Sequence, residues 1–393
     1  MNACATVIPM TITQVQLAAV LEVFEQNFAT RGELGASVSI WQHGNQLLTQ
    51  SAGWCEREKL RPWTDDTVVP FWSATKGIAA TCVLHALETA GINLDDKVAE
   101  LWPAFATASK QDITFAQLLS HQAGLAALDH PADIFDYPSV IRALEQQEPN
   151  WQPGTAHGYH PRTFGFLLDA VVRRASDAES LGTYWRKHFA EPLGLDLWIG
   201  LPESEDHRVA KLYSGKMQDT PGEEDFYRAF TDQKSLARRA FASPGGLAAI
   251  TGMNDQRAQR AGLPAMGGIG TAASLGKFYA MIAAGGKWQG ETYVSEKFLT
   301  LAESTLTSDL DKTFQLQTAF SAGFMKDPLD TFGEKRRQLF GPETRAFGHP
   351  GAGGSHAFAD PENGIAFAYT MNQMSYGVLP NVRSLEMVAA LYT

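Results

Sequence analysis

The sequence predicts an α/β (α+β) protein, with an antiparallel sheet flanked by N- and C-terminal helices and an inserted, mostly helical lobe. Strand patterns occur near both ends of the chain, at residues 36–50 and 318–370, and the segment between them is mostly helical. The 393 residues are enough for two lobes and a large core. We therefore expect a discontinuous lobe formed by residues 1–72 and 283–393, and a helical lobe formed by residues 73–282.

The N-terminal elements are a helix followed by a hairpin. Residues 12–29 place apolar side chains at helical spacing after polar residues suited to a cap, which predicts an amphipathic helix. Residues 36–41 and 46–50 have strand patterns, and the His-Gly-Asn tripeptide at residues 43–45 is typical of the turn between two paired strands.

The middle of the chain has mostly helical sequence patterns. Ser73 opens a long helix of small residues that ends near Gly91, and helical patterns continue to about residue 282. Loops rich in proline and glycine interrupt them, at residues 151–154 and 242–246.

Strand patterns return late in the chain. They cover residues 318–325 and 355–360, and the second segment pairs across a turn with residues 365–370. A final helix at residues 381–392 closes the chain. Because strands at both ends complete one sheet, we expect both termini in the same lobe.

Composition and charge exclude several classes of protein. Hydrophobic residues make up 44% of the chain and charged residues 19%, which is typical of a globular protein. The net charge of -11 and the isoelectric point near 5.4 argue against nucleic-acid and anionic-membrane partners. The sequence leaves the oligomeric state open.

The cysteines and the N-terminus indicate a reducing compartment. Cys4, Cys55 and Cys82 are odd in number and lack C-x-x-C spacing, so we expect reduced thiols rather than disulfides or a zinc site. Residues 1–10 lack the basic and apolar regions of a signal peptide, and no segment has the apolar length of a membrane span. We therefore expect a cytoplasmic protein.

Ser73 and Lys76 carry the main chemical signal. A serine hydroxyl is a poor nucleophile until a base lies within hydrogen-bond reach, and positions i and i+3 of a helix share a face. A lysine serves as that base when burial and nearby positive charge keep it neutral. The first helical turn also offers free backbone N–H groups beside the serine oxygen. The same spacing at Ser274 and Lys277 lies within an ordinary amphipathic helix, where we expect the lysine on a solvated face.

A serine–lysine pair needs a proton carrier to the leaving group and an oxyanion pocket, and two further segments are candidates for them. Tyr159, in a loop ahead of a helix, is a candidate proton carrier to the leaving group. The glycine-rich segment at residues 347–355 lets backbone approach a ligand closely and is a candidate oxyanion pocket. Each has an ordinary structural interpretation, as a packed tyrosine and as a bend between strands. Their order and spacing together favour a catalytic role.

With these motifs the chain resembles the serine β-lactamase and penicillin-binding-protein-like hydrolases, and within them the class C β-lactamase-like branch that includes family VIII carboxylesterases. The resemblance runs from about residue 12 to the C-terminus and includes three further phrases, at residues 91–98, at 118–125 with Gln122, and at 192–195. It implies an active site between the two lobes.

The resemblance implies that Ser73 is the nucleophile, Lys76 its partner base, and Tyr159 the first residue of the family's Y-x-N motif. Pro161 occupies the third position of that motif, so the amide side chain that contacts a substrate carbonyl is missing. His160 and Gln122 are candidate substrate-binding residues, and whether His160 replaces the missing amide stays open.

The family's K-T-G segment aligns with residues 349–351, which places His349 at the lysine position and Gly351 at the glycine. The positive charge at this position would then depend on pH. The oxyanion would lie between the backbone N–H groups of Ser73 and Ala352, because Pro350 has no N–H. An uncharged ester suits such a site better than a lactam carboxylate, which favours a carboxylesterase that uses a serine acyl-enzyme.

Several alternatives remain at this point. A β-lactamase, a D-amino-acid peptidase and an acyltransferase share the fold, and a non-enzymatic scaffold is a further possibility. A metal hydrolase is disfavoured because His157 and His160 share a loop without an H-E-x-x-H motif or a dense ligand cluster. No serine lies in a G-x-S-x-G elbow, and no phosphate-binding glycine fingerprint is present. We expect no metal and no cofactor.

Overall fold

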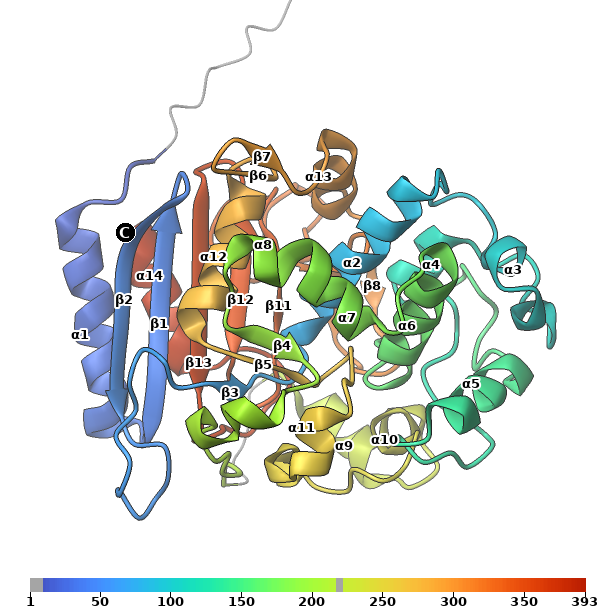
Figure 1. Ribbon diagram of the computed structural model, residues 1–393, viewed down its shortest axis with the longest axis horizontal. Helices are drawn as coiled ribbons and strands as arrows, with labels where there is room; N and C mark the ends of the chain where they lie inside the picture. The colour runs from blue at the N-terminus through green and yellow to red at the C-terminus, as the bar shows by residue number, and fades with distance from the viewer. Residues whose placement is uncertain (1–9, 217–221) are drawn as a thin grey trace, which may run out of the picture.

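The computed structural model describes residues 10–216 and 222–393. An eight-stranded sheet with the order β2-β1-β13-β12-β11-β10-β9-β8 forms one side of the molecule, and all neighbouring strands are antiparallel (Figure 1). The strands are β1 (Gly35–Gln42), β2 (Asn45–Gly53), β8 (Thr307–Leu310), β9 (Gln317–Phe320), β10 (Met325–Lys326), β11 (Phe347–Pro350), β12 (His356–Asp360) and β13 (Ile365–Met371).

Helices cover both faces of this sheet, and three of them come from distant parts of the chain. The first helix, α1 (Gln14–Thr30), packs against the last, α14 (Val382–Tyr392), while α12 (Ala272–Ala283) packs against β1, β12 and β13 on the other face (Figure 1). A Cβ on Gly276 of α12 would lie 2.9 Å from Trp41 Nε1 of β1, so glycine at this position lets the helix pack closely against the sheet. The predicted antiparallel sheet with terminal helices is confirmed.

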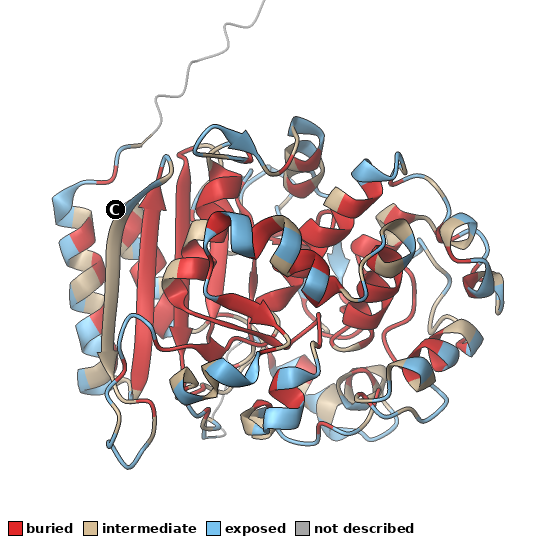
Figure 2. Cartoon of the chain, in the orientation of Figure 1, coloured by how far each residue is buried: buried red, intermediate tan, exposed pale blue. Residues whose placement is uncertain are grey.

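The remaining helices lie beside the sheet, and α6 (Thr163–Ala175) and α7 (Leu181–Trp185) among them pack against α2 (Thr75–Thr89), which is buried along most of its length (Figure 2). The others are α3 (Val98–Leu101), α4 (Phe115–Leu119), α5 (Tyr137–Gln146), α8 (Glu191–Leu193), α9 (Glu224–Thr231), α10 (Leu236–Ala242), α11 (Gln256–Arg260) and α13 (Glu296–Glu303). Short 3-10 turns cover Pro103–Ala106, Glu203–Arg208 and Ile250–Asn254, and a π-helical turn covers Arg186–Ala190.

Five short strands were not predicted from the sequence patterns. A three-stranded sheet joins β3 (Val69–Pro70), β5 (Gly268–Gly270) and β4 (Leu197–Ile199), and a hairpin pairs β6 (Lys287–Trp288) with β7 (Glu291–Thr292). Strands of two or three residues are too short to show the alternation that identifies longer ones.

Two predicted segments differ from the structure in detail. The segment expected as one strand at residues 318–325 is two strands, β9 and β10, joined by a tight turn in which Ser321 N–H donates to the Phe324 carbonyl. Residues 347–350 were expected between strands, but they form β11 in the middle of the sheet. This strand therefore belongs to the sheet that borders the site.

The structure also bears on three expectations from the sequence: free cysteines, no membrane-spanning helix and no metal site. Cys55 and Cys82 are buried and unpaired, and Cys4 lies outside the described residues. Within residues 10–216 and 222–393, no helix has the length and apolar character needed to cross a membrane. Over the same ranges, no group of three or more His, Cys, Asp or Glu side chains is arranged to hold a metal ion.

Candidate active site

Ser73 lies in a tight turn between β3 and α2. Its carbonyl accepts a hydrogen bond from Lys76 N–H at 2.9 Å, and the helix proper begins at Thr75, two residues later than the sequence predicted. The preceding residue, Trp72, has a left-handed φ of 49°, which is strained for an aromatic side chain. The turn leaves the Ser73 side chain half-buried at the wall of a cavity.

Lys76 is fully buried and contacts Ser73 directly. Its Nζ lies 3.2 Å from Ser73 Oγ and donates to the carbonyls of Pro161 and Ala265, at 2.9 Å each. Burial alone holds the pKa of this amine well below its ordinary value, because no carboxylate is among the groups that shift it. A neutral amine has two N–H bonds and one lone pair. When the amine is neutral and both N–H bonds are on these carbonyls, its third position, directed at the serine hydroxyl, carries the lone pair.

Tyr159 completes a three-residue cluster around the serine oxygen. Lys76 Nζ lies 4.7 Å from the centre of its ring, and its hydroxyl forms a hydrogen bond with Ser73. Burial raises the pKa of the phenol well above its ordinary value, and this effect outweighs the hydrogen bond to Ser73, which lowers it. Tyr159 is therefore a phenol at neutral pH and can donate a proton while Lys76 accepts one.

Asp311 fixes the position of Tyr159, and no motif in the sequence points to this residue. Its buried carboxylate accepts the Tyr159 N–H at 3.0 and 3.1 Å from its two oxygens, together with the N–H groups of Thr313 and Phe314 and the hydroxyl of Thr318. Phe314 also stacks on the Tyr159 ring, with the ring centres 4.5 Å apart. The backbone and the ring of the tyrosine are thus held from the β8–β9 side of the cluster.

His349 lies on β11, beside Tyr159, with their ring centres 5.8 Å apart. Its Nδ1 donates to the Pro350 carbonyl at 2.8 Å, so the neutral ring carries its lone pair on Nε2. Burial, reinforced by Lys76, lowers the pKa of His349 to about 3. The expectation of a pH-dependent cation at this position is therefore wrong for the pH range in which enzymes work, because the imidazole stays neutral there.

The backbone beside Ser73 can form an oxyanion hole. In the described part of the chain, neither Ser73 N–H nor Ala352 N–H has a hydrogen-bond partner, and both residues line the same cavity. Gly351 allows the glycine-rich loop to approach, because a Cβ there would lie 2.0 Å from the Phe71 carbonyl oxygen. Its own N–H donates to the Ser355 carbonyl at 2.6 Å, so Gly351 shapes the loop and does not itself donate into the cavity.

The cavity that contains Ser73 has a volume of about 570 Å³ and a largely apolar wall. Trp72 and Ala352 lie beside the serine, and much of the remaining wall is aromatic or sulfur-containing. These residues include Phe226, Phe230, Phe241, Tyr376, Met266 and Met374. Such a wall suits an apolar acyl or alcohol group.

His160 and Gln122 do not line this cavity. His160 Nδ1 donates to the Gly158 carbonyl at 2.6 Å, and its Nε2 accepts the Leu125 N–H at 2.9 Å, so both ring nitrogens are engaged by backbone. Gln122 donates from its side chain to Ser120 Oγ at 2.7 Å. Both side chains hold loops together in this structure.

The second S-x-x-K sequence has no comparable geometry. Ser274 Oγ accepts the Asp196 N–H at 2.9 Å, and Lys277 Nζ donates to the Leu193 carbonyl at 2.5 Å. Lys277 is half-buried rather than on a solvated face as predicted. The spacing alone therefore does not produce a catalytic pair.

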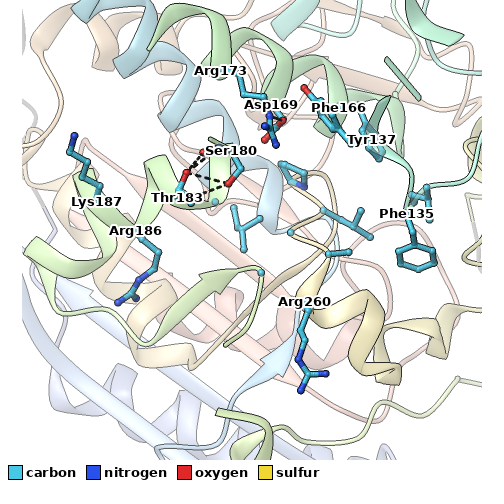
Figure 3. A pocket seen from close by; sticks show the side chains of 18 of the residues that line it. Phe135, Tyr137, Phe166, Asp169, Arg173, Ser180, Thr183, Arg186, Lys187 and Arg260 are labelled. Carbon is cyan, nitrogen blue, oxygen red and sulfur yellow. Dashed lines mark hydrogen bonds and ion pairs between the residues drawn. The ribbon is translucent and has the colours of Figure 1, made fainter. Parts of the chain in front are cut away.

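A second cavity of about 530 Å³ shares no wall residue with the one at Ser73 (Figure 3). Three arginines in its wall have carboxylate partners: Arg173 with Asp169, Arg186 with Glu191, and Arg260 with Asp206. It contains none of the predicted site residues.

A serine hydroxyl, a buried amine with a lowered pKa, a phenol, and two backbone N–H groups without partners in the described residues therefore lie together at this place in the fold. The chain belongs to the Beta-lactamase family, whose model matches residues 22–390, which confirms the resemblance drawn from the motifs. It is 30% identical to the Esterase/beta-lactamase LipL of Mycobacterium tuberculosis over 368 residues, which cover 91% of this chain and 82% of LipL.

Two solved structures match almost the whole chain. One is a penicillin-binding protein homologue from Caulobacter crescentus, with a TM-score of 0.86 and 33% identity over 98% of this chain and 99% of its own. The other is a family VIII carboxylesterase, with a TM-score of 0.84, 32% identity and the same coverage.

Proposed function

We propose that this protein is a carboxylesterase that cleaves small carboxylic esters through an acyl-enzyme on Ser73. The observation that carries the proposal is the contact of 3.2 Å between Ser73 Oγ and the buried Lys76 Nζ. The similarity to LipL and to a family VIII carboxylesterase supports the same activity.

In the proposed acylation step, Ser73 Oγ attacks the ester carbonyl carbon and its proton passes to the lone pair of Lys76. The negative charge that develops on the carbonyl oxygen is stabilised by the N–H groups of Ser73 and Ala352. As the bond between the carbonyl carbon and the alcohol oxygen breaks, the Tyr159 hydroxyl gives its proton to the departing alkoxide. The proton held by Lys76 then restores Tyr159.

In the proposed deacylation step, a water molecule attacks the acyl carbon and gives one proton to the Tyr159 hydroxyl oxygen, while that hydroxyl passes its own proton to the neutral amine of Lys76. The bond between the acyl carbon and Ser73 Oγ breaks, the serine regains a proton, and the carboxylic acid leaves. Every step uses the same three side chains, and none requires a group beyond the chain and the substrate.

Two features favour esters over lactams. Position 161 is a proline whose carbonyl is already bound by Lys76, so no amide side chain is available there for a lactam acyl-amide. On β11, the imidazole of His349 is neutral, with its pKa lowered to about 3 by burial, so this strand offers no cation to a lactam carboxylate. Each unpaired polar group on a bound substrate costs about 1 to 3 kcal/mol.

The test is a comparison of kcat/KM for p-nitrophenyl acetate and butyrate with that for nitrocefin at pH 7 to 8. We expect much faster hydrolysis of the esters, because two missing contacts lower lactam turnover by a few powers of ten relative to an optimised lactamase. Equal or faster hydrolysis of the cephalosporin would replace this proposal with the β-lactamase alternative.

We propose that the boundaries between the lobes lie near residues 72 and 282, with the active site between the lobes, and that the partner is a small-molecule ester. A cytoplasmic location is supported by the unpaired thiols of Cys55 and Cys82, which suit a reducing compartment. Cell fractionation tests the location.

A further inference from the structure

Two arginines line the Ser73 cavity, and neither has a carboxylate partner within residues 10–216 and 222–393. Arg162 follows Pro161 in the loop that carries Tyr159, and Arg238 lies on α10. Neither forms an ion pair, and no Asp or Glu is present in the cavity wall of the described residues. The wall therefore has a net positive charge beside an otherwise apolar lining.

Arg162 is held firmly but keeps free hydrogen-bonding capacity. Its two terminal nitrogens donate to the carbonyls of Pro244 and Leu247, at 2.7 Å each. A guanidinium has five N–H donors, so three remain available after these two bonds. Burial, reinforced by the nearby charge of Arg238, lowers the pKa of Arg162 to about 10, which leaves it charged at neutral pH.

Arg238 is less constrained. Its guanidinium carbon lies 5.1 Å from the centre of the Phe230 ring, which also lines the cavity, and its Nε makes a long contact of 3.4 Å with Gln233. Both terminal nitrogens are without partners in the described part of the chain. Two cations that repel each other, in a wall without a carboxylate, are stabilised when an anion binds between them.

The second cavity differs from the Ser73 cavity in how its arginines are paired. There, Arg173, Arg186 and Arg260 each have a carboxylate of the chain as partner. The chain has 43 Asp and Glu residues against 32 Lys and Arg, so acidic partners are abundant.

We infer that the ester cleaved at Ser73 carries a carboxylate on its apolar portion, and that Arg238 and Arg162 bind this carboxylate. This inference rests on the proposed function and specifies its substrate class. The aromatic wall takes the apolar body of the substrate, the free N–H groups of Ser73 and Ala352 take the carbonyl oxygen, and the guanidinium groups take the distal carboxylate. A planar guanidinium suits a carboxylate because it can donate two parallel hydrogen bonds.

Two pairs of matched substrates test the inference. The acyl side is tested with the p-nitrophenyl hemiester of glutaric acid against p-nitrophenyl valerate. The alcohol side is tested with 4-acetoxybenzoate against its methyl ester. Each pair differs in charge with little change in the apolar body. The measured quantity is the ratio of kcat/KM for the charged ester to that for the neutral ester.

The variant is Arg238→Gln, since replacing Arg162 would also release the carbonyls of Pro244 and Leu247 and could unfold their loop. The matched control is Arg228→Gln, an exposed arginine on α9 that removes the same charge outside the cavity wall. In at least one substrate pair, we expect the ratio to fall about tenfold or more in Arg238→Gln, as expected for a charged hydrogen bond, and to change less than twofold in Arg228→Gln.

The outcomes separate this inference from the proposed function. If the wild type hydrolyses neutral esters but the ratio is the same in wild type and Arg238→Gln for both pairs, the inference is wrong and the carboxylesterase proposal stands. An equal fall in both variants would show a general effect of charge and would also refute it. If the wild type hydrolyses none of the esters, the proposed function itself fails.

Discussion

Replacing Lys76 by arginine tests whether this side chain is a neutral base. Arginine keeps the positive charge and the donors of a protonated lysine, but it cannot accept a proton at any accessible pH. Lys76 Nζ donates to the Pro161 and Ala265 carbonyls, and its third contact is with Ser73 Oγ, 3.2 Å away. Lys76→Arg therefore places a permanent charge where the account requires a neutral amine, and Lys76→Met removes the base without adding a charge.

The expected loss follows from the role of the group. A general base contributes about 10²- to 10⁴-fold to the rate, which corresponds to about 3 to 5 kcal/mol of activation free energy. We expect both variants to lose at least 10²-fold in kcat on p-nitrophenyl butyrate. The control is Lys277 in the second S-x-x-K sequence, whose Nζ binds the Leu193 carbonyl and not the serine. Lys277→Arg should keep most of the activity.

The pH profile of the wild type gives the same test without a variant. Burial lowers the pKa of Lys76, so its neutral, active form predominates above a pH well below 10.5. Burial raises the pKa of Tyr159 above 10, so the phenol is not lost on the alkaline side below pH 10. We expect kcat/KM to rise with pH to a plateau that is reached well below pH 10.5.

Two results would refute this reasoning. The first is a Lys76→Arg variant, folded by circular dichroism and thermal unfolding, that keeps more than about a tenth of the wild-type kcat, since losing a general base costs far more than that. The second is a rising limb with its midpoint at the ordinary lysine pKa, which would mean that the amine is protonated in the working enzyme.

Three further predictions concern groups around the site and in the sheet. Tyr159→Phe should lose roughly 10²-fold or more in kcat, because the proton donor to the alkoxide is gone, and steady-state kinetics on p-nitrophenyl butyrate checks this. Asp311→Asn should lower kcat more than it changes KM, and should cost about 2 to 4 kcal/mol of unfolding free energy, because a buried carboxylate with four donor groups is lost. Burial lowers the pKa of His356 to about 3, against about 6.5 when unfolded, so stability falls as pH drops below 6.5. His356→Leu should therefore reduce the loss of unfolding free energy between pH 7 and pH 5 by about 2 kcal/mol, measured by urea denaturation, and an unchanged loss would contradict a neutral buried imidazole.

The sequence predicted the parts of the fold that have long periodic patterns. The helix at residues 12–29, the hairpin that follows it and the C-terminal helix are present as α1, β1–β2 and α14. Strands of two to four residues, such as β5 and β11, were missed because they are too short for an alternating pattern.

The part of the candidate site formed by residues close together in the sequence could be predicted from the sequence. Ser73 and Lys76 are three positions apart, so their contact follows from local geometry. The contact of Asp311 with Tyr159 spans 152 positions, and the Ala265 carbonyl that holds Lys76 is 189 positions away from it. Such contacts depend on the tertiary fold and leave no pattern in one sequence.

Burial explains why the charge of His349 was predicted wrongly. An exposed histidine titrates near pH 6.5, and the sequence places His349 in a glycine-rich segment that gives no sign of depth. In the structure the residue lies on an inner strand of the sheet, fully buried, with a pKa lowered to about 3. Desolvation, which depends on the whole fold, decides its protonation state.

The most direct test of the central claim is the intact mass of the protein after reaction with a fluorophosphonate probe, with peptide mapping of the modified site. The account predicts one adduct per chain, located on Ser73, with no adduct on Ser73→Ala and a much slower reaction for Lys76→Met. A folded wild-type protein that remains unlabelled, or that is labelled at another serine to the same extent in Ser73→Ala, would contradict the account and favour a scaffold that has kept the fold without the chemistry.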